Sequence, residues 1–297
     1  RVELKTAITN APALGMAQPM VAGDRLNRVW HEPNRMLRIR DVLPVGRTTS
    51  NVVWFPKEDT FTNNAAVVRN TSASPIVAAE NVTKPESALT FTSDSEEVVT
   101  IAHFIPVSKQ ALDDSDFLSS YVNSRLMYGL KLTEDAQLLN GTGVTGYISG
   151  ISTNSTAYAQ ADSPHSYDDS VEYLRDAVRQ LQQANYMPSA MIMNPKDWAD
   201  LELKREASNG QFIWADPTRM AAPRFWGMDV VVSNTCSAGS AYVLDPSVYQ
   251  IFDREDAAVE ISYEDSTNFQ KNMATIRAEE RLAFVSYSTA GCVKVTL

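Results

Sequence analysis

The glycine-rich segment that begins at Gly141 is the sequence feature closest to a known cofactor motif. Gly141-Thr-Gly-Val-Thr-Gly146 matches the pattern G-x-G-x-x-G of dinucleotide-binding loops. That loop functions between a strand and a helix, because the helix N-terminus holds the pyrophosphate. Here the pattern follows a predicted helix and precedes irregular chain, so it is typical of a helix end and a turn. We expect no cofactor.

The histidines do not form a metal site. His31, His103 and His165 are far apart in the sequence and lack the spacing of zinc ligands. His103 lies in the apolar run 101–104, which favours a structural role. The signatures of serine hydrolases, zinc proteases and phosphate-binding loops do not occur. The sequence therefore predicts neither a metal centre nor an ordinary enzyme.

Composition limits the partners. Apolar residues make up 44% of the 297 residues, which predicts a globular chain, and the net charge is −10. Acidic chains are poorly suited to wrapping nucleic acid, because neutralising phosphates requires Lys and Arg. No apolar run reaches the length of a membrane span, and residues 1–18 do not resemble a signal peptide. Cys236 and Cys292 are expected to be reduced thiols.

A secreted β-rich binding module is an alternative raised by four N-x-S/T sequons. These begin at Asn70, Asn81, Asn140 and Asn154. The lack of a signal peptide and of paired cysteines argues against this alternative.

The chain divides into segments of different character. Residues 1–33 contain three prolines and weak periodicity, which predicts an extended arm. Residues 50–108 are typical of strands interrupted by a polar stretch at 60–86, which we interpret as a projecting hairpin. Residues 113–140 have the apolar spacing of a helix about 40 Å long that ends at Gly141.

From residue 168 the pattern alternates between helices and strands. A helix begins near Asp168, a buried strand covers 190–193, and Asn194-Pro195 begins another helix. Further strands are expected at 228–233, 241–244, 248–252, 257–263, 272–286 and 291–297. The expected fold class is α+β.

Several short blocks occur in the order seen in one protein family. They are Gly46-Arg-Thr-Thr-Ser-Asn51, Phe61-Thr-Asn-Asn-Ala65, Lys84-Pro-Glu-Ser87, Thr100-Ile-Ala-His103, Tyr121-Val-Asn-Ser-Arg-Leu-Met-Tyr-Gly129, Gln137-Leu-Leu-Asn-Gly141, Asn194-Pro-Lys-Asp-Trp198, Phe269-Gln-Lys-Asn-Met273 and Glu279-Glu-Arg-Leu-Ala283. From about Gln18 to the C-terminus, the chain resembles the Hong Kong 97-type major capsid proteins.

The resemblance implies a division of the chain into the named parts of that fold. These are an N-terminal arm at 1–33, a first part of the peripheral (P) domain at 34–51, an E-loop hairpin at 52–97, the P domain with its long spine helix at 98–143, an axial (A) domain at 144–271 and return strands to the P domain at 272–297.

The implied function is that of a major capsid protein of a tailed double-stranded DNA bacteriophage. Such subunits form hexamers and pentamers of an icosahedral head in the host cytoplasm, and become part of the virion. The implied partners are other copies, a portal, a maturation protease and a decoration protein, with DNA enclosed without sequence-specific binding and no membrane. Removal of a preceding scaffolding segment would explain why the chain starts at Arg1.

An encapsulin-type bacterial compartment, which stores a cargo enzyme, is the alternative with the same fold. The block Lys84-Pro-Glu-Ser87 and the asparagine-rich loop favour the phage protein.

The resemblance also implies a covalent cross-link. In one branch of the family a Lys joins an Asn of a neighbouring subunit and a Glu promotes the reaction; the matching positions are Lys84, Asn272 and Glu279. A free Lys amine has a pKa near 10.4, so about one in a few thousand is neutral at pH 7, and burial or a proton-accepting carboxylate must help. Seven residues of strand span about 23 Å, so we expect the three groups to come from different subunits.

Two features of the predicted strand argue against cross-linking and leave an alternative role for these residues open. Alternation places Glu280, not Glu279, on the apolar face, and Arg277 shares the face of Glu279. The loop before Lys84 is also longer than in the founding member, around 69–79. The alternative to cross-linking is a set of ordinary salt bridges between subunits.

Overall fold

The computed structural model describes residues 33–36, 39–70, 77–78, 82–113, 116–160, 169–205, 223–265 and 267–297. The chain divides into two compact units, Arg1–Asn34 and Arg35–Leu297. The expected arm at 1–33 lies outside the described residues except for its last residue. The second unit contains all the helices and strands of the described residues.

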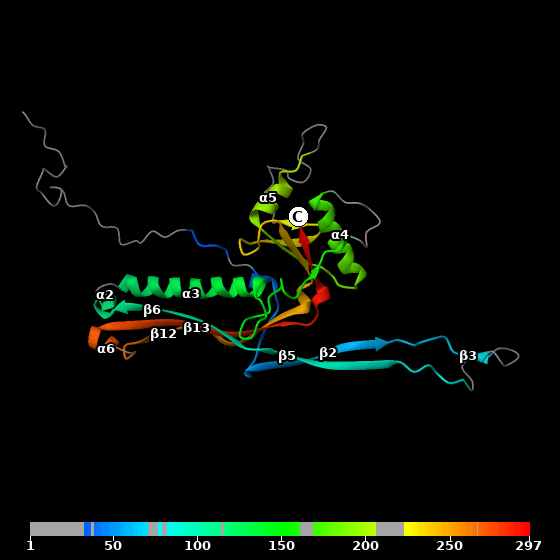
Figure 1. The fold of residues 1–297 in the computed structure, drawn as a ribbon, viewed down its shortest axis with the longest axis horizontal. Coiled ribbons are helices and arrows are strands. Elements are labelled where there is room, and N and C mark those ends of the chain that lie inside the picture. The colour runs from blue at the N-terminus through cyan, green and yellow to red at the C-terminus, as the bar shows by residue number, and fades with distance from the viewer. Residues whose placement is uncertain are drawn as a thin grey trace, which may run out of the picture. The chain divides into compact units, whose positions relative to one another are not determined.

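The long helix packs against a four-stranded sheet. Its strand order is β1 (Val45–Arg47), β12 (Tyr249–Ser262), β13 (Met273–Ser286) and β6 (Val99–Ser108). Helix α3 (Asp116–Asn140) runs alongside this sheet (Figure 1), and the short helices α1 (Ile39–Val42) and α2 (Lys109–Asp113) adjoin α3. The apolar side chains between helix and sheet are fully or almost fully buried: Leu126, Leu130, Ile276 and Ala278.

Helix α3 confirms the long helix expected from apolar spacing. It ends at Asn140, and a Cβ on Gly141 would lie 2.2 Å from the backbone oxygen of Ile148, so a larger residue does not fit. The ring of His103 on β6 lies 2.9 Å from the carbonyl oxygen of Leu126 on the helix. This hydrogen bond confirms the structural role expected for His103 and fixes the helix against the sheet.

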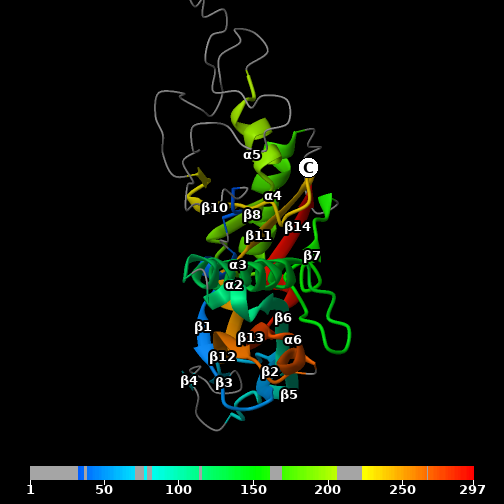
Figure 2. The same cartoon turned by 90° about the vertical axis from the view of Figure 1, so that its left-hand side faces the viewer.

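A six-stranded sheet is the second large sheet of the unit. Its order is β7 (Thr156–Ala157), β14 (Cys292–Thr296), β11 (Ser240–Leu244), β8 (Ala190–Met193), β10 (Met228–Val232) and β9 (Arg224–Phe225). Figure 2 shows β10, β8, β11 and β14 side by side, with α4 (Ser170–Gln183) and α5 (Pro195–Glu202) next to them. All four residues of β8 are buried, as expected for a central strand.

Local sequence explains where these two helices begin. The side chain of Asp169 accepts a hydrogen bond from the Val171 amide at the start of α4. Asn194 caps α5 in the same way, and Pro195 occupies the first helical position, as expected from the sequence. The apolar side of α4 includes Leu174 and Leu181, which are fully buried.

The structure shows the sheet to which two of the expected strands belong, which the sequence did not indicate. The segments 248–252 and 257–263, assigned to the A domain, form one bulged strand β12 that pairs with β13 in the four-stranded sheet. β14, assigned to the strands returning to the P domain, pairs with β11 and β7 in the six-stranded sheet.

A tight turn explains the change of sheet. After β13 the chain passes through the 3-10 helix η3 (Thr289–Gly291), where a Cβ on Gly291 would lie 2.4 Å from Val248 of the 3-10 helix η2 (Pro246–Val248). This close packing directs the last strand between β7 and β11, where Val293 and Val295 are buried.

The expected hairpin is present as two long antiparallel strands. β2 (Val52–Thr62) pairs with β5 (Ala88–Glu97), and the two-residue strands β3 (Arg69–Asn70) and β4 (Val77–Ala78) pair beyond them. Trp54 is 69% exposed, Phe61 58% and Phe91 64%. Large aromatic side chains exposed in this number are typical of a surface that contacts another molecule.

Candidate functional site

The two faces of β13 differ in their surroundings. Residues of β13 alternate between buried and more exposed from Met273 to Leu282, and from Thr275 onward the strand lies between β6 and β12. The buried face packs on α3. The open face presents Arg277 and Glu279, which belong to the segment singled out by the sequence.

Glu279 lies on the open face between two alanines. It pairs with Ala102 of β6 and Ala258 of β12, and both alanines are exposed. Because alanine side chains are short, they leave the Glu279 carboxylate, which is 27% exposed, accessible from outside. A carboxylate in this position can accept a proton from a group that approaches the sheet.

Arg277 shares its guanidinium between two carboxylates. Its Nη2 lies 2.8 Å from Glu260 Oε2, and its Nε lies 3.3 Å from Glu279 Oε2. The sequence placed Arg277 on the face of Glu279, and the ion pair confirms this. It did not reveal Glu260, because that contact depends on the register between β12 and β13.

Asn272 occupies the turn that precedes β13. It follows the short helix α6 (Asn268–Lys271) with φ 53° and ψ 44°, a left-handed conformation that asparagine tolerates better than most residues. Its backbone oxygen accepts a hydrogen bond of 2.9 Å from the Lys109 amide. The residue is exposed, and its backbone is held from both sides.

Lys84 lies on the segment that leads into β5. The residue is exposed, and its Nζ lies 3.5 Å from the backbone oxygen of Val82. The extra residues expected around 69–79 lie partly outside the described residues.

The extended chain separates the three candidate residues. From Lys84 the chain continues through β5 and then β6, whose far end adjoins Asn272 through Lys109 (Figure 1). Between Asn272 and Glu279, β13 pairs regularly with β6, and seven residues of regular strand span about 23 Å. One subunit therefore does not bring Asn272 and Glu279 to one point.

The buried face of β13 contains an ionic network that the sequence did not predict. Lys131 Nζ of α3 lies 2.8 Å from Glu280 Oε2 and 2.8 Å from Glu134 Oε2. Arg40 of α1 contacts Glu134 and also Asp253 of β12. The network joins two helices to two strands. Only the inward position of Glu280 could be read from the sequence, by alternation.

Burial determines the protonation behaviour of this network. Burial raises the pKa of Glu280, the Lys131 hydrogen bond lowers it and the Glu134 charge raises it, and the pKa remains above its usual value. Burial lowers the pKa of Lys131, but hydrogen bonds and charges from Glu134 and Glu280 outweigh this and leave the pKa raised.

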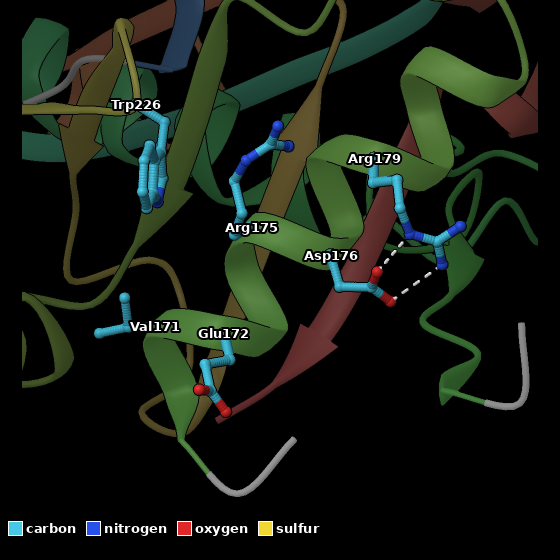
Figure 3. Close-up of a pocket in the computed structure, with 6 residues that line it drawn as sticks. All are labelled: Val171, Glu172, Arg175, Asp176, Arg179 and Trp226. Atoms are coloured by element: carbon cyan, nitrogen blue, oxygen red, sulfur yellow. Dashed lines mark hydrogen bonds and ion pairs between the residues drawn. The ribbon is translucent and has the colours of Figure 1, made fainter. Parts of the chain in front are cut away.

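A hollow on α4 is a second candidate for a binding site. It has a volume of about 350 Å³, and Figure 3 shows the ion pair between Asp176 and Arg179 in its wall. Asp176 also accepts a hydrogen bond of 3.0 Å from Tyr158, and Arg175 lies 5.7 Å from the centroid of the Trp226 ring. These charged groups already have partners, so the hollow provides no reactive group.

Other site classes have no counterpart in the described part of the chain. No group of three or more His, Cys, Asp and Glu residues there is arranged to hold a metal ion. None of the helices described has the length and apolar character needed to cross a membrane. Cys236 and Cys292 are buried, and burial raises the pKa of each thiol to about 12, which makes them poor nucleophiles at neutral pH.

Comparison with known proteins gives a consistent result. The model of the "Phage capsid family" matches residues 18–297. The major capsid protein of Enterobacteria phage HK97 is 39% identical over 263 residues, which cover 88% of this chain and 65% of that protein. The chain thus spans about two thirds of the length of this relative.

Solved structures show the same fold at low sequence identity. A chain from Gordonia phage Cozz superposes with a TM-score of 0.74 at 13% identity, covering 98% of each chain. A chain from Mycobacterium phage Bobi gives 0.73 at 17% identity, covering 93% of this chain and 95% of its own. The capsid of an empty GTA particle also gives 0.73, at 18% identity, with 93% and 96% covered.

The fold expected from the sequence is confirmed as the α+β fold of Hong Kong 97-type capsid proteins. The family model matches most of the chain. The HK97 relative is 39% identical, which is high enough to show membership of the family as well as the fold. This chain belongs to the phage capsid family.

Proposed function

We propose that this chain is the major capsid protein of a tailed double-stranded DNA bacteriophage and builds an icosahedral shell of hexamers and pentamers. The observation that carries this proposal is the match to the phage capsid family over residues 18–297. The HK97 relative is itself a major capsid protein. The net charge of −10 suits the inner wall of a container that must not bind the DNA it encloses.

The hairpin supports assembly from copies of the same chain. A two-stranded hairpin is marginally stable alone, and the ladder between β2 and β5 exposes Trp54, Phe61 and Phe91. Burying such side chains against a neighbouring subunit stabilises the hairpin and the contact together, because each aromatic side chain removes a large apolar area from water.

Shortening the hairpin tests this assembly role. The complete gene product lacking residues 60–86 should yield a folded subunit, measured by circular dichroism, but no stable shells by electron microscopy. Normal shells from this variant would contradict the proposal. The contents of wild-type particles provide the second test, because packaged DNA is expected, whereas an enclosed cargo enzyme would identify an encapsulin-type compartment instead.

We further propose that subunits become joined by an isopeptide bond between Lys84 of one subunit and Asn272 of another, promoted by Glu279 of a third. The Lys84 amine attacks the side-chain carbonyl carbon of Asn272, so a new N–C bond forms. The bond from that carbon to Nδ2 then breaks. Glu279 takes one amine proton and returns it to Nδ2, which leaves as ammonia.

The geometry of the isolated subunit agrees with a reaction confined to the assembly. Lys84 and Asn272 are exposed, and Glu279 is accessible between two alanines. About 23 Å of strand separates Asn272 from Glu279 within one chain. Asn272 and Glu279 can therefore meet at one bond only when they come from different subunits.

Denaturing gel electrophoresis of purified particles tests the bond. A ladder of covalent oligomers is expected, and Lys84→Arg, Asn272→Asp and Glu279→Gln should each restore the monomer band. A single monomer band from wild-type particles would contradict cross-linking and would favour ordinary salt bridges at these positions.

A further inference from the structure

The open face of β13 contains a charged group that competes for the Glu279 carboxylate. The side chain of Arg277 is 52% exposed, and its guanidinium lies between Glu279, whose side chain is 27% exposed, and Glu260, whose side chain is 70% exposed. The contact to Glu260 is shorter, at 2.8 Å against 3.3 Å for Glu279. One cation thus serves two carboxylates on neighbouring strands.

This shared cation matters for any ammonium group that approaches Glu279. Like charges at contact distance repel, so a guanidinium held on Glu279 opposes the arrival of a lysine. It also pairs with Oε2, one of the two carboxylate oxygens that can accept the amine proton. Glu279 becomes available when Arg277 moves fully onto Glu260.

The structure leaves space for this movement. A hollow of about 360 Å³ lies on the same face, and its wall includes Phe104, Glu260, Ile261 and Arg277. Arg277 pairs with Phe104 and Glu260 across the two neighbouring strands, so its side chain extends along this row of the sheet. Arg277 and Glu260 both line this hollow, so the half-exposed arginine side chain borders open space next to Glu260.

We propose that Glu260 is a positioning residue for the cross-linking reaction, which draws Arg277 away from Glu279 and so frees Glu279 to receive a proton. This inference rests on the proposed cross-link. It assigns separate parts to the three charged residues: Glu279 acts on the amine, Arg277 restrains Glu279 in the unengaged subunit, and Glu260 relieves that restraint.

A double-mutant cycle tests this assignment. Glu260→Gln should slow the formation of covalent oligomers by about threefold to fivefold, the range set by an exposed ion pair. Arg277→Gln should react at least as fast as wild type. In the double variant the effect of Glu260→Gln should disappear, because the arginine that Glu260 draws away is gone.

The control for the cycle is the ion pair between Arg47 and Asp256. Its atoms are 2.9 Å apart, Asp256 is 66% exposed, and it lies on the same strand as Glu260. Asp256→Asn should leave the rate unchanged. Because all these side chains are exposed, each variant is expected to assemble, which electron microscopy of the same samples checks.

The outcomes separate the two proposals. If wild-type particles form no covalent oligomers, the cross-link itself is wrong and the role of Glu260 falls with it. If wild-type particles cross-link but Glu260→Gln has no effect, or slows both backgrounds equally, only the role of Glu260 is overturned. Loss of cross-linking in Arg277→Gln would likewise overturn it, because Arg277 would then be required.

Discussion

Glu279 and Glu280 are consecutive residues of β13, but they lie on opposite faces of the sheet. Glu280 is 2% exposed and binds Lys131 of the same subunit at 2.8 Å. Glu279 lies between two exposed alanines, and its ion pair with Arg277 is longer, at 3.3 Å. The same side-chain chemistry therefore occurs in a closed network and on an open surface, one residue apart.

The difference between these two faces separates stability from assembly. On the buried face, charges are neutralised inside the subunit, where an unpaired charge would strongly destabilise the fold. On the open face, the alternation of the strand places charged groups where another copy can reach them. A change on one face should leave the role of the other intact.

The largest expected effect is on the rate of cross-linking, when each of the two glutamates is replaced singly by glutamine. Glu279→Gln should slow cross-linking by about 100-fold or more, the usual contribution of a proton acceptor, and leave the unfolding free energy unchanged to within about 1 kcal/mol. Glu280→Gln should retain cross-linking. Densitometry of denaturing gels and urea unfolding of unassembled subunits measure both; equal loss of cross-linking in the two variants would remove the distinction between the faces.

The buried network should respond next most strongly. Lys131→Met leaves Glu134 and Glu280 without their shared lysine, and should lower the unfolding free energy by about 2 kcal/mol. Lys57→Met is the matched control, because Lys57 is 30% exposed and Lys131 31%, but Lys57 binds the half-exposed Asp94. The control should cost at most about 1 kcal/mol in urea unfolding. Equal effects of the two variants would show that burial of the partner carboxylates does not matter.

The pH dependence of stability sharpens the same comparison. Burial raises the pKa of Glu280 in the folded subunit, so the folded state binds this proton more tightly than the unfolded state. Its contribution to stability is therefore largest at low pH, and falls as pH rises from the usual glutamate pKa through the raised one. Glu280→Gln should remove this fall in stability. The measurement is the difference in unfolding free energy between the variant and wild type, obtained by urea unfolding at several pH values across that range. A difference that does not change with pH would contradict the assignment.

The smallest effect is expected at a fully exposed pair. The side chain of Arg47 is 78% exposed and that of its partner Asp256 is 66% exposed. Arg47→Gln removes their contact and should change the unfolding free energy by less than about 1 kcal/mol. A larger loss in urea unfolding would mean that the open face stabilises the subunit as well as presenting charges.

Sequence patterns predicted those features that depend on neighbouring residues. Apolar spacing identified α3, the residues Asn194 and Pro195 identified the start of α5, and alternation placed Glu280 inside. The hairpin was expected from the long polar stretch between two strands. Each of these features follows from local geometry, which the order of side chains determines.

Contacts between distant segments could not be predicted in this way. Lys131 and Glu280 are 149 residues apart, and Arg40 and Asp253 are 213 apart. Periodicity shows which side of a strand is buried, but not which helix covers it. The same limit applies to β14, because its pattern indicates a buried strand but does not show that it pairs with β11 and β7.

The origin of the linked residues tests the central claim most directly. Particles assembled from a mixture of unlabelled and heavy-isotope-labelled subunits are digested, and the peptides that join Lys84 to Asn272 are identified by mass spectrometry. We predict linked peptides that carry both isotopes, each with the loss of one ammonia. If every linked peptide carried a single isotope, or if no linked peptide were found, the claim that the open face of β13 acts between subunits would be contradicted.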